Sequence, residues 1–198
     1  MRHLFGAVAL ATALGAGAGE ALAHSFKVGL IAPFSGPAAA TGEQLRAGFM
    51  VATREADGHP DEDSDGHLGG LDVYVLPVDG AAGTGAMLAR VRELVEREEV
   101  EILTGLADPR TMAAIRRAAA GTEAIVIELS ADAAPARETG DPATFAATFE
   151  RDYGYKPSRD AFAGYGAARL IDRAVRALGG NLSKRQALRA AIAAAGAR

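Results

Sequence analysis

Four short and nearly continuous apolar runs constrain the fold of this chain more than any other feature. They occupy residues 28–32, 73–78, 100–103 and 124–129. A strand that faces water on one side alternates apolar and polar residues, whereas a strand in a parallel sheet is covered on both faces and is apolar throughout. The runs therefore predict buried strands of a parallel sheet.

Amphipathic patterns lie between these runs and predict helices. Residues 42–56 and 84–98 place apolar side chains at helical spacing, with charged side chains on the opposite face. A third pattern begins at Pro109, and proline is well placed in the first turn of a helix. This alternation predicts an α/β fold, a doubly wound parallel sheet of about four strands with flanking helices and right-handed crossovers.

The pattern changes after the fourth run, where alanine, proline and acidic residues dominate. Beyond this segment the spacing predicts three helices, over residues 142–153, 158–178 and 183–195. Ser158 and Ser183 are the predicted N-caps, and Gly154 is a predicted helix stop. Aromatic residues recur along the first two of these helices, and we interpret them as packing residues rather than as the lining of a ligand pocket.

The first 23 residues have the order of a secretory signal peptide. A short basic start is followed by an apolar stretch over residues 4–19 and by the small-x-small site Ala21-Leu22-Ala23. A membrane anchor is the alternative, but this stretch is shorter than the ~20 residues needed to span and is interrupted by glycines. We therefore predict cleavage before His24, a periplasmic product and no membrane span after cleavage.

Composition excludes several classes of function. The chain has no cysteine, so disulfides, thiolate metal sites and cysteine nucleophiles are excluded. Acidic residues outnumber basic ones by 25 to 21, which argues against a nucleic-acid partner. Ser35 lacks the context of a nucleophile elbow, and Gly83-Thr84-Gly85 is too short for a phosphate-binding loop. We predict that the protein is not an enzyme.

Ligands of open parallel sheets bind beyond the carboxyl ends of the strands, where the strand order reverses. Three loops follow predicted strands and run toward helix N-termini, which attract anions and carboxylates. These loops are residues 33–41, 104–111 and 130–135.

Several short blocks carry a family resemblance, and they occur in family order. The first block is FKVGLIAPFSGP at residues 26–37, and the others lie at residues 41–48, 68–79 and 157–168. They resemble type I periplasmic solute-binding proteins, the receptors of ABC importers, and above all the leucine/isoleucine/valine-binding branch. The resemblance implies a small polar solute such as an amino acid, with an ABC permease or another periplasmic protein as partner.

Members of that family are longer and have two lobes that close over the ligand, whereas this chain resembles one lobe. On this interpretation residues 24–198 form a single lobe. Residues 24–129 are its α/β core, residues 130–141 mark the place of the missing second lobe, and residues 142–198 are a helical return segment.

The resemblance also implies a set of ligand-binding positions in the three loops. They are Ser35, Thr41, Asp108, Arg110, Thr111, Ser130 and Asp132. We expect a non-catalytic binding or accessory role. The alternative is a protein-interaction module that has lost small-ligand binding, in which the exposed half-cleft docks on a partner protein or on a second copy of the chain.

An acidic loop precedes the second predicted strand and matches the D-x-D-x-D-G pattern of calcium loops. Its candidate metal ligands are Asp61, Asp63, Asp65, His67 and Asp72. The terminal aspartate resembles the calcium loops of dockerin modules. Zinc or copper bound through histidine is a second possibility, and a solvated insertion that binds no cofactor is a third.

Overall fold

The structure is a computed structural model, and it describes residues 24–57, 63–129 and 141–196. The helices and strands follow the predicted order. They are β1 (Ser25–Ala32), a 3-10 turn η1 (Gly36–Ala38), α1 (Ala39–Glu55), β2 (His67–Leu68), β3 (Leu71–Asp79), α2 (Thr84–Glu96), β4 (Ile102–Gly105), α3 (Pro109–Ala118), β5 (Ile125–Glu128), α4 (Pro142–Tyr153), α5 (Arg159–Ala177) and α6 (Arg185–Gly196).

The described strands form one five-stranded sheet with the order β2-β3-β1-β4-β5. Strands β3, β1, β4 and β5 are parallel to one another, which confirms the predicted doubly wound sheet. The fifth strand, β2, is antiparallel to β3 and was not predicted. A strand of two residues is too short to show a hydrophobic period, so the sequence pattern could not reveal it.

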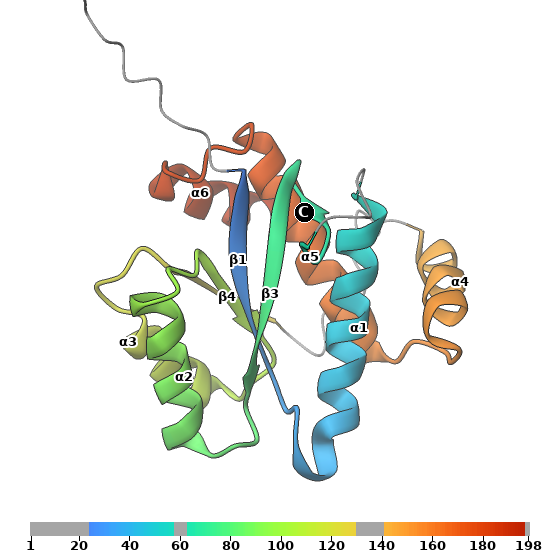
Figure 1. Cartoon of the computed structure of the whole chain (residues 1–198), viewed down its shortest axis with the longest axis horizontal. Coiled ribbons are helices and arrows are strands. Elements are labelled where there is room, and N and C mark those ends of the chain that lie inside the picture. The colour runs from blue at the N-terminus through green and yellow to red at the C-terminus, as the bar shows by residue number, and fades with distance from the viewer. Residues whose placement is uncertain (1–23, 58–62, 130–140, 197–198) are drawn as a thin grey trace, which may run out of the picture.

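Helices cover both faces of the sheet (Figure 1). α1 and α5 lie on one face, α2 and α3 lie on the other, and α4 lies outside α1. Two consecutive residues of β1 show why the run is continuously apolar. Leu30 belongs to the core cluster under α1 and α5, whereas Ile31 belongs to the cluster under α2 and α3. Both side chains are fully buried.

Two glycines permit the close contact between α1 and α5. A Cβ atom on Gly48 would overlap the carbonyl oxygen of Ala161, and one on Gly164 would overlap the carbonyl oxygen of Leu45. The two helices therefore approach each other backbone to backbone. This contact joins the first helix to the return segment, which holds α5 on the sheet.

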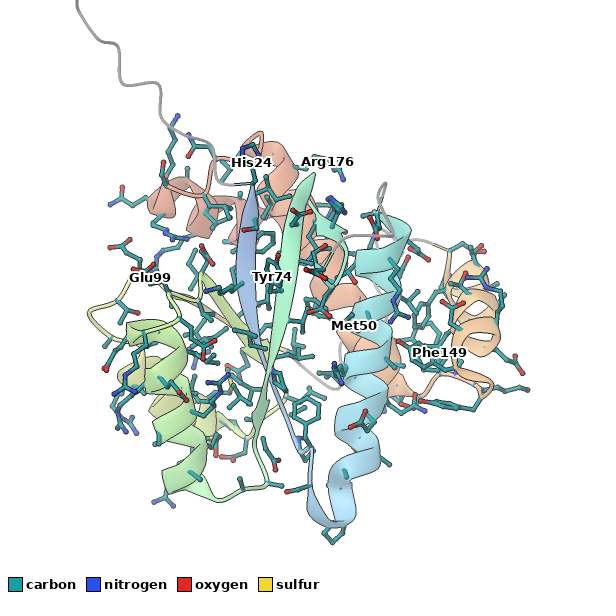
Figure 2. The ribbon with its side chains drawn as sticks, viewed as in Figure 1. His24, Met50, Tyr74, Glu99, Phe149 and Arg176 are labelled. Atoms are coloured by element: carbon teal, nitrogen blue, oxygen red, sulfur yellow. The ribbon has the colours of Figure 1, made fainter. Side chains whose placement is uncertain are left out.

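The aromatic residues of α4 and α5 pack into the core, as the sequence predicts. Phe145 and Phe149 are buried, and Figure 2 shows the Phe149 side chain between α4 and α1. The ring centroid of Phe145 lies 4.7 Å from that of Phe162 and 4.3 Å from that of Tyr165. Aromatic pairs at such separations add to the stabilisation by burial.

The predicted helix boundaries agree with the structure at most ends. Ser158 caps α5 by accepting hydrogen bonds from the N–H groups of Asp160 and Ala161, and Gly154 ends α4 in the left-handed region at φ 77°. The predicted cap at Ser183 is wrong, because α6 begins at Arg185 and the Ser183 hydroxyl donates to Asn181 instead. Such one-residue differences are common where a helix begins with a turn.

Two predictions about the ends and middle of the chain lie outside the described residues. The first is the signal peptide at residues 1–23. The second is the segment 130–141 at the place of the missing lobe, where only Asp141 is described. Among the described residues no helix is both long enough and apolar enough to cross a membrane.

Candidate functional site at the carboxyl edge of the sheet

The strand order reverses between β1 and β4. The chain passes from β1 to β3 on one side, and then returns past β1 to β4 on the other side. The crevice at such a switch point is the usual ligand site of this sheet class. A Cβ atom on Gly105, the last residue of β4, would overlap the backbone of Ile31, so the two strands end in close contact there.

Asp79, at the end of β3, holds the loop that follows β1. Its Oδ1 accepts hydrogen bonds from the backbone N–H groups of Phe34 and Ala81, each at 2.9 Å. The Ser35 side chain also hydrogen-bonds to the Asp79 carboxylate, and this bond is the main reason why the pKa of Asp79 lies below its usual value. Ser35, a predicted ligand residue, therefore helps to fix its own loop.

Asp108 caps α3 with both carboxylate oxygens. Oδ1 accepts from the backbone N–H groups of Arg110 and Thr111, at 2.9 Å and 3.1 Å, and Oδ2 accepts from the Thr111 hydroxyl. The hydrogen bond from the Thr111 hydroxyl is the largest cause that lowers the pKa of Asp108. Two N–H groups that the sequence analysis left free for an anionic ligand are thus occupied by the protein itself.

The same capping pattern occurs at α4, and a sequence signal for it was missed. Asp141 accepts from the N–H groups of Ala143 and Thr144 and from the Thr144 hydroxyl. Both helices begin with the sequence Asp-Pro-x-Thr, in which aspartate is a preferred N-cap and proline suits the first turn. This repeated motif predicts a capping role for Asp108 rather than a ligand role.

The N-terminus of α1 has no such cap. Its N-cap residue is Ala38, which has no side-chain cap among the described residues. The 3-10 turn η1 runs directly into the helix, and the backbone N–H of Ala39 donates to the carbonyl oxygen of Gly36. Thr41 lies in this first turn and is half-buried. α2 also begins without a side-chain cap, but it follows β3, on the far side of β1 from the switch point. The positive end of α1 therefore lies beside the crevice and carries no side-chain cap from the described residues.

Three further predicted positions complete the site. Arg110 is exposed at the start of α3, on the same edge of the sheet. Ser130 and Asp132 lie outside the described residues. The structure therefore brings Ser35, Thr41, Asp108, Arg110 and Thr111 to one edge of the sheet, and it assigns capping or loop-fixing contacts to three of them: Ser35, Asp108 and Thr111.

A family model for periplasmic binding proteins matches residues 25–145, which is more than half of the chain. The chain belongs to the periplasmic binding protein family. No curated protein sequence matches it.

Solved structures of ABC transporter solute-binding proteins share the fold of this periplasmic binding protein. A solute-binding protein of R. palustris in complex with benzoate is 14% identical, with a TM-score of 0.61, and 85% of each chain is covered. The leucine-binding protein LivK of Thermotoga maritima is 10% identical, with a TM-score of 0.63 and coverage of 84% of this chain and 87% of that chain. LivJ of Streptococcus pneumoniae, in complex with isoleucine, is 10% identical, with a TM-score of 0.52 and coverage of 83% and 87%.

The acidic loop of this periplasmic binding protein lies at the opposite, amino edge of the sheet. His67 lies between two carboxylates, with Nδ1 2.9 Å from Asp57 Oδ1 and Nε2 2.8 Å from Asp72 Oδ1. Asp65 Oδ2 accepts a hydrogen bond from the backbone N–H of Val75 at 2.8 Å. These contacts attach the loop to β3.

The same contacts bear on the calcium hypothesis. Within the described part of the loop, no group of three or more histidine and acidic side chains is arranged to hold a metal ion. Asp63 is exposed, and Asp61 lies outside the described residues. Calcium binding by Asp61, Asp63, Asp65 and Asp72 therefore stays a prediction, and Asp65 and His67 have structural contacts of their own.

Proposed function

We propose that this periplasmic binding protein is an exported, non-catalytic receptor or accessory component of an ABC importer. It binds a small carboxylate-bearing solute at the carboxyl edge of the sheet. The observation that carries the proposal is the N-terminus of α1 beside the switch point, which no described side chain caps, since the positive end of a helix attracts carboxylates. The benzoate and isoleucine bound by two of the solved relatives both carry a carboxylate.

The site residues have distinct roles in this proposal. The first turn of α1 receives the carboxylate, and Thr41 adds a hydroxyl from the same turn. Ser35 and Asp79 hold the loop that shapes the site. Arg110 supplies a positive charge from α3. If the solute is a branched-chain amino acid, Ser130 and Asp132 are the residues expected to meet its ammonium group.

Isothermal titration of residues 24–198 with isoleucine, leucine and benzoate tests the proposal. Thr41→Glu places a carboxylate in the first turn of α1, where it neutralises the helix dipole and repels the ligand. We expect this variant to lose binding while its melting temperature is equal or higher. Thr41→Gln has a similar size without the charge and is expected to retain most of the affinity.

Arg110→Ala tests the second positive group. It is expected to weaken binding of a carboxylate by about tenfold or more, because hydrogen bonds to charged groups contribute ~1.5–3 kcal/mol. Arg92→Ala removes an exposed arginine from α2 and is the matched control. Equal effects of the two variants would exclude Arg110 from the site.

A docking role is the second candidate. Phe34, Leu106 and Leu129 are partly exposed apolar side chains at the carboxyl edge. If they dock on a second copy, sedimentation should show a concentration-dependent dimer, and titration with the solutes should show no heat. Micromolar solute binding by a monomer would exclude this alternative.

Export is part of the proposal. Processing of the full-length chain is expected to leave His24 as the first residue of the periplasmic product, which amino-terminal sequencing measures. A product that retains Met1 would contradict the signal-peptide prediction.

A further inference from the structure

A cavity of about 340 Å³ lies away from the carboxyl edge, between the end of α3, edge strand β5 and α6. Figure 1 shows α6 at the end of the sheet where β1 begins, which is opposite to the loops of the candidate solute site. Small residues of the turn between α3 and β5 form much of its lining, and Arg116 and Arg189 also line it. This volume lies within the usual range for small-ligand sites.

The two arginines come from different elements of the fold. Arg116 lies on α3, and its Nη2 contacts Glu128 Oε2 at 2.6 Å. Arg189 lies on α6, and its Nη2 donates to the carbonyl oxygen of Ala124 at 3.3 Å. A guanidinium has five N–H donors, so these contacts leave most donors of both groups for a ligand.

The end of α3 would ordinarily disfavour an anion, because its last carbonyl groups carry partial negative charge. Here two of these carbonyl groups already accept hydrogen bonds. The backbone N–H and hydroxyl of Thr122 both donate to Ala119 O, at 3.2 Å and 2.8 Å, and the N–H of Ala120 donates to Arg117 O. The carbonyl groups are thereby partly neutralised. Glu128 offsets the charge of Arg116, whereas Arg189 donates only to a neutral carbonyl group.

We propose that this cavity binds a phosphoryl dianion, free or as a small phosphate ester. Two guanidinium groups that reach a ligand from separate elements suit a tetrahedral oxyanion, which can accept hydrogen bonds from both at once. A planar carboxylate is satisfied by one guanidinium. The site is separate from the proposed solute site at the other edge of the sheet, so either can fail without the other.

Calorimetric titration of residues 24–198 at low ionic strength tests this proposal, with inorganic phosphate and glycerol 3-phosphate as the two probes. Tighter binding of the ester would assign the site to an ester, and tighter binding of phosphate would assign it to the free ion. Arg116→Ala and Arg189→Ala are each expected to weaken binding by about tenfold. Arg92→Ala, on helix α2, which contributes no residue to the cavity lining, should bind as the wild type does.

Glu128→Gln provides a test that loss of folding cannot imitate. This variant removes the carboxylate that competes for Arg116, so it is expected to bind phosphate several-fold more tightly. The proposal is overturned if neither probe binds above a sodium chloride control of equal ionic strength, if Arg92→Ala loses as much affinity as Arg189→Ala, or if succinate binds as tightly as phosphate.

Discussion

The carboxylate of Asp172 on α5 accepts a hydrogen bond from the backbone N–H of Gly69 at 2.8 Å, although 103 residues separate them along the chain. Asp172 is only 4% exposed, and its Oδ1 also accepts from Arg176 Nη2 at 2.9 Å. The bond fastens the turn between β2 and β3 to the return helix. It therefore joins the first half of the chain to the last.

Asp172→Ala is expected to lower the free energy of unfolding by about 1–3 kcal/mol, because it leaves the half-buried Gly69 N–H without its partner. Urea unfolding measures this change. Asp172→Asn keeps an acceptor oxygen, and Arg176→Ala removes only the more exposed partner. Both variants should therefore lose less stability than Asp172→Ala. A larger loss in Arg176→Ala would show that the ion pair, rather than the Gly69 bond, is the stabilising contact.

Gly164→Ala is expected to destabilise the protein by about 1–3 kcal/mol, the usual cost of an extra methyl group in a tightly packed core. The new Cβ would overlap the backbone of α1 at Leu45. Gly85→Ala is the matched control, since a Cβ atom there meets no atom within 4 Å. Thermal unfolding of both variants checks the prediction, and an equal response would remove the close helix contact as the cause.

Thr104→Val is expected to raise the free energy of unfolding by about 1 kcal/mol. Thr104 is fully buried on β4, and its hydroxyl has no hydrogen-bond partner among the residues that the structure describes, so valine removes a polar group that is costly to bury. Thr53 is equally buried but donates to the carbonyl oxygens of Met50 and Asp65. Thr53→Val should therefore destabilise, and a loss of stability in Thr104→Val would reveal a bonded hydroxyl.

Acid should destabilise the protein in part through Asp79 and Asp108. The pKa of each carboxyl is lowered in the folded state, chiefly by the hydrogen bonds from Ser35 and from Thr111. A lowered pKa contributes stability that is present above the ordinary value of 3.8 and is lost as the pH falls through the folded value. Asp79→Asn should therefore flatten the loss of stability below about pH 4, which urea unfolding at several pH values measures.

Glu101 affects stability in acid in the opposite direction. Burial is the largest cause that raises the pKa of this carboxyl, which also accepts a hydrogen bond from the Lys27 backbone N–H. Protonation is then easier in the folded state than in the unfolded state, so Glu101 offsets part of the acid destabilisation. In a Glu101→Gln variant the free energy of unfolding should fall more steeply with decreasing pH than in the wild type. A shallower fall would contradict the raised pKa.

The calcium hypothesis predicts a higher melting temperature in millimolar calcium. Linkage gives ~1–2 kcal/mol when the calcium concentration is ten or more times the dissociation constant. Asp61→Asn combined with Asp63→Asn should abolish the rise, and it leaves Asp65 in its hydrogen bond to Val75. An equal rise in magnesium would indicate general charge screening, and no rise in calcium would return the loop to a solvated insertion.

The sequence was sufficient to predict the parallel strands and the helices, because these depend on local patterns of burial. Leu30 and Ile31 are both apolar since each faces a different helical layer, and the amphipathic patterns mark helices that are buried on one side. Pro109 and Pro142 mark helix starts within the sequence itself. The family resemblance likewise rests on short local blocks, and the match of the family model to residues 25–145 confirms the family.

Other features were decided only by the tertiary structure, because they depend on residues that are distant in the chain. The cap of Asp108 is not one of them: this residue was predicted to face a ligand, but its carboxylate is used by the first turn of its own helix, and the local Asp-Pro-x-Thr motif indicates this role. The bond between Asp172 and Gly69, and the meeting of Arg116 and Arg189 at one cavity, have no local signal. A periodic pattern records whether a side chain is buried, whereas the partner it meets is set by how the helices pack on the sheet.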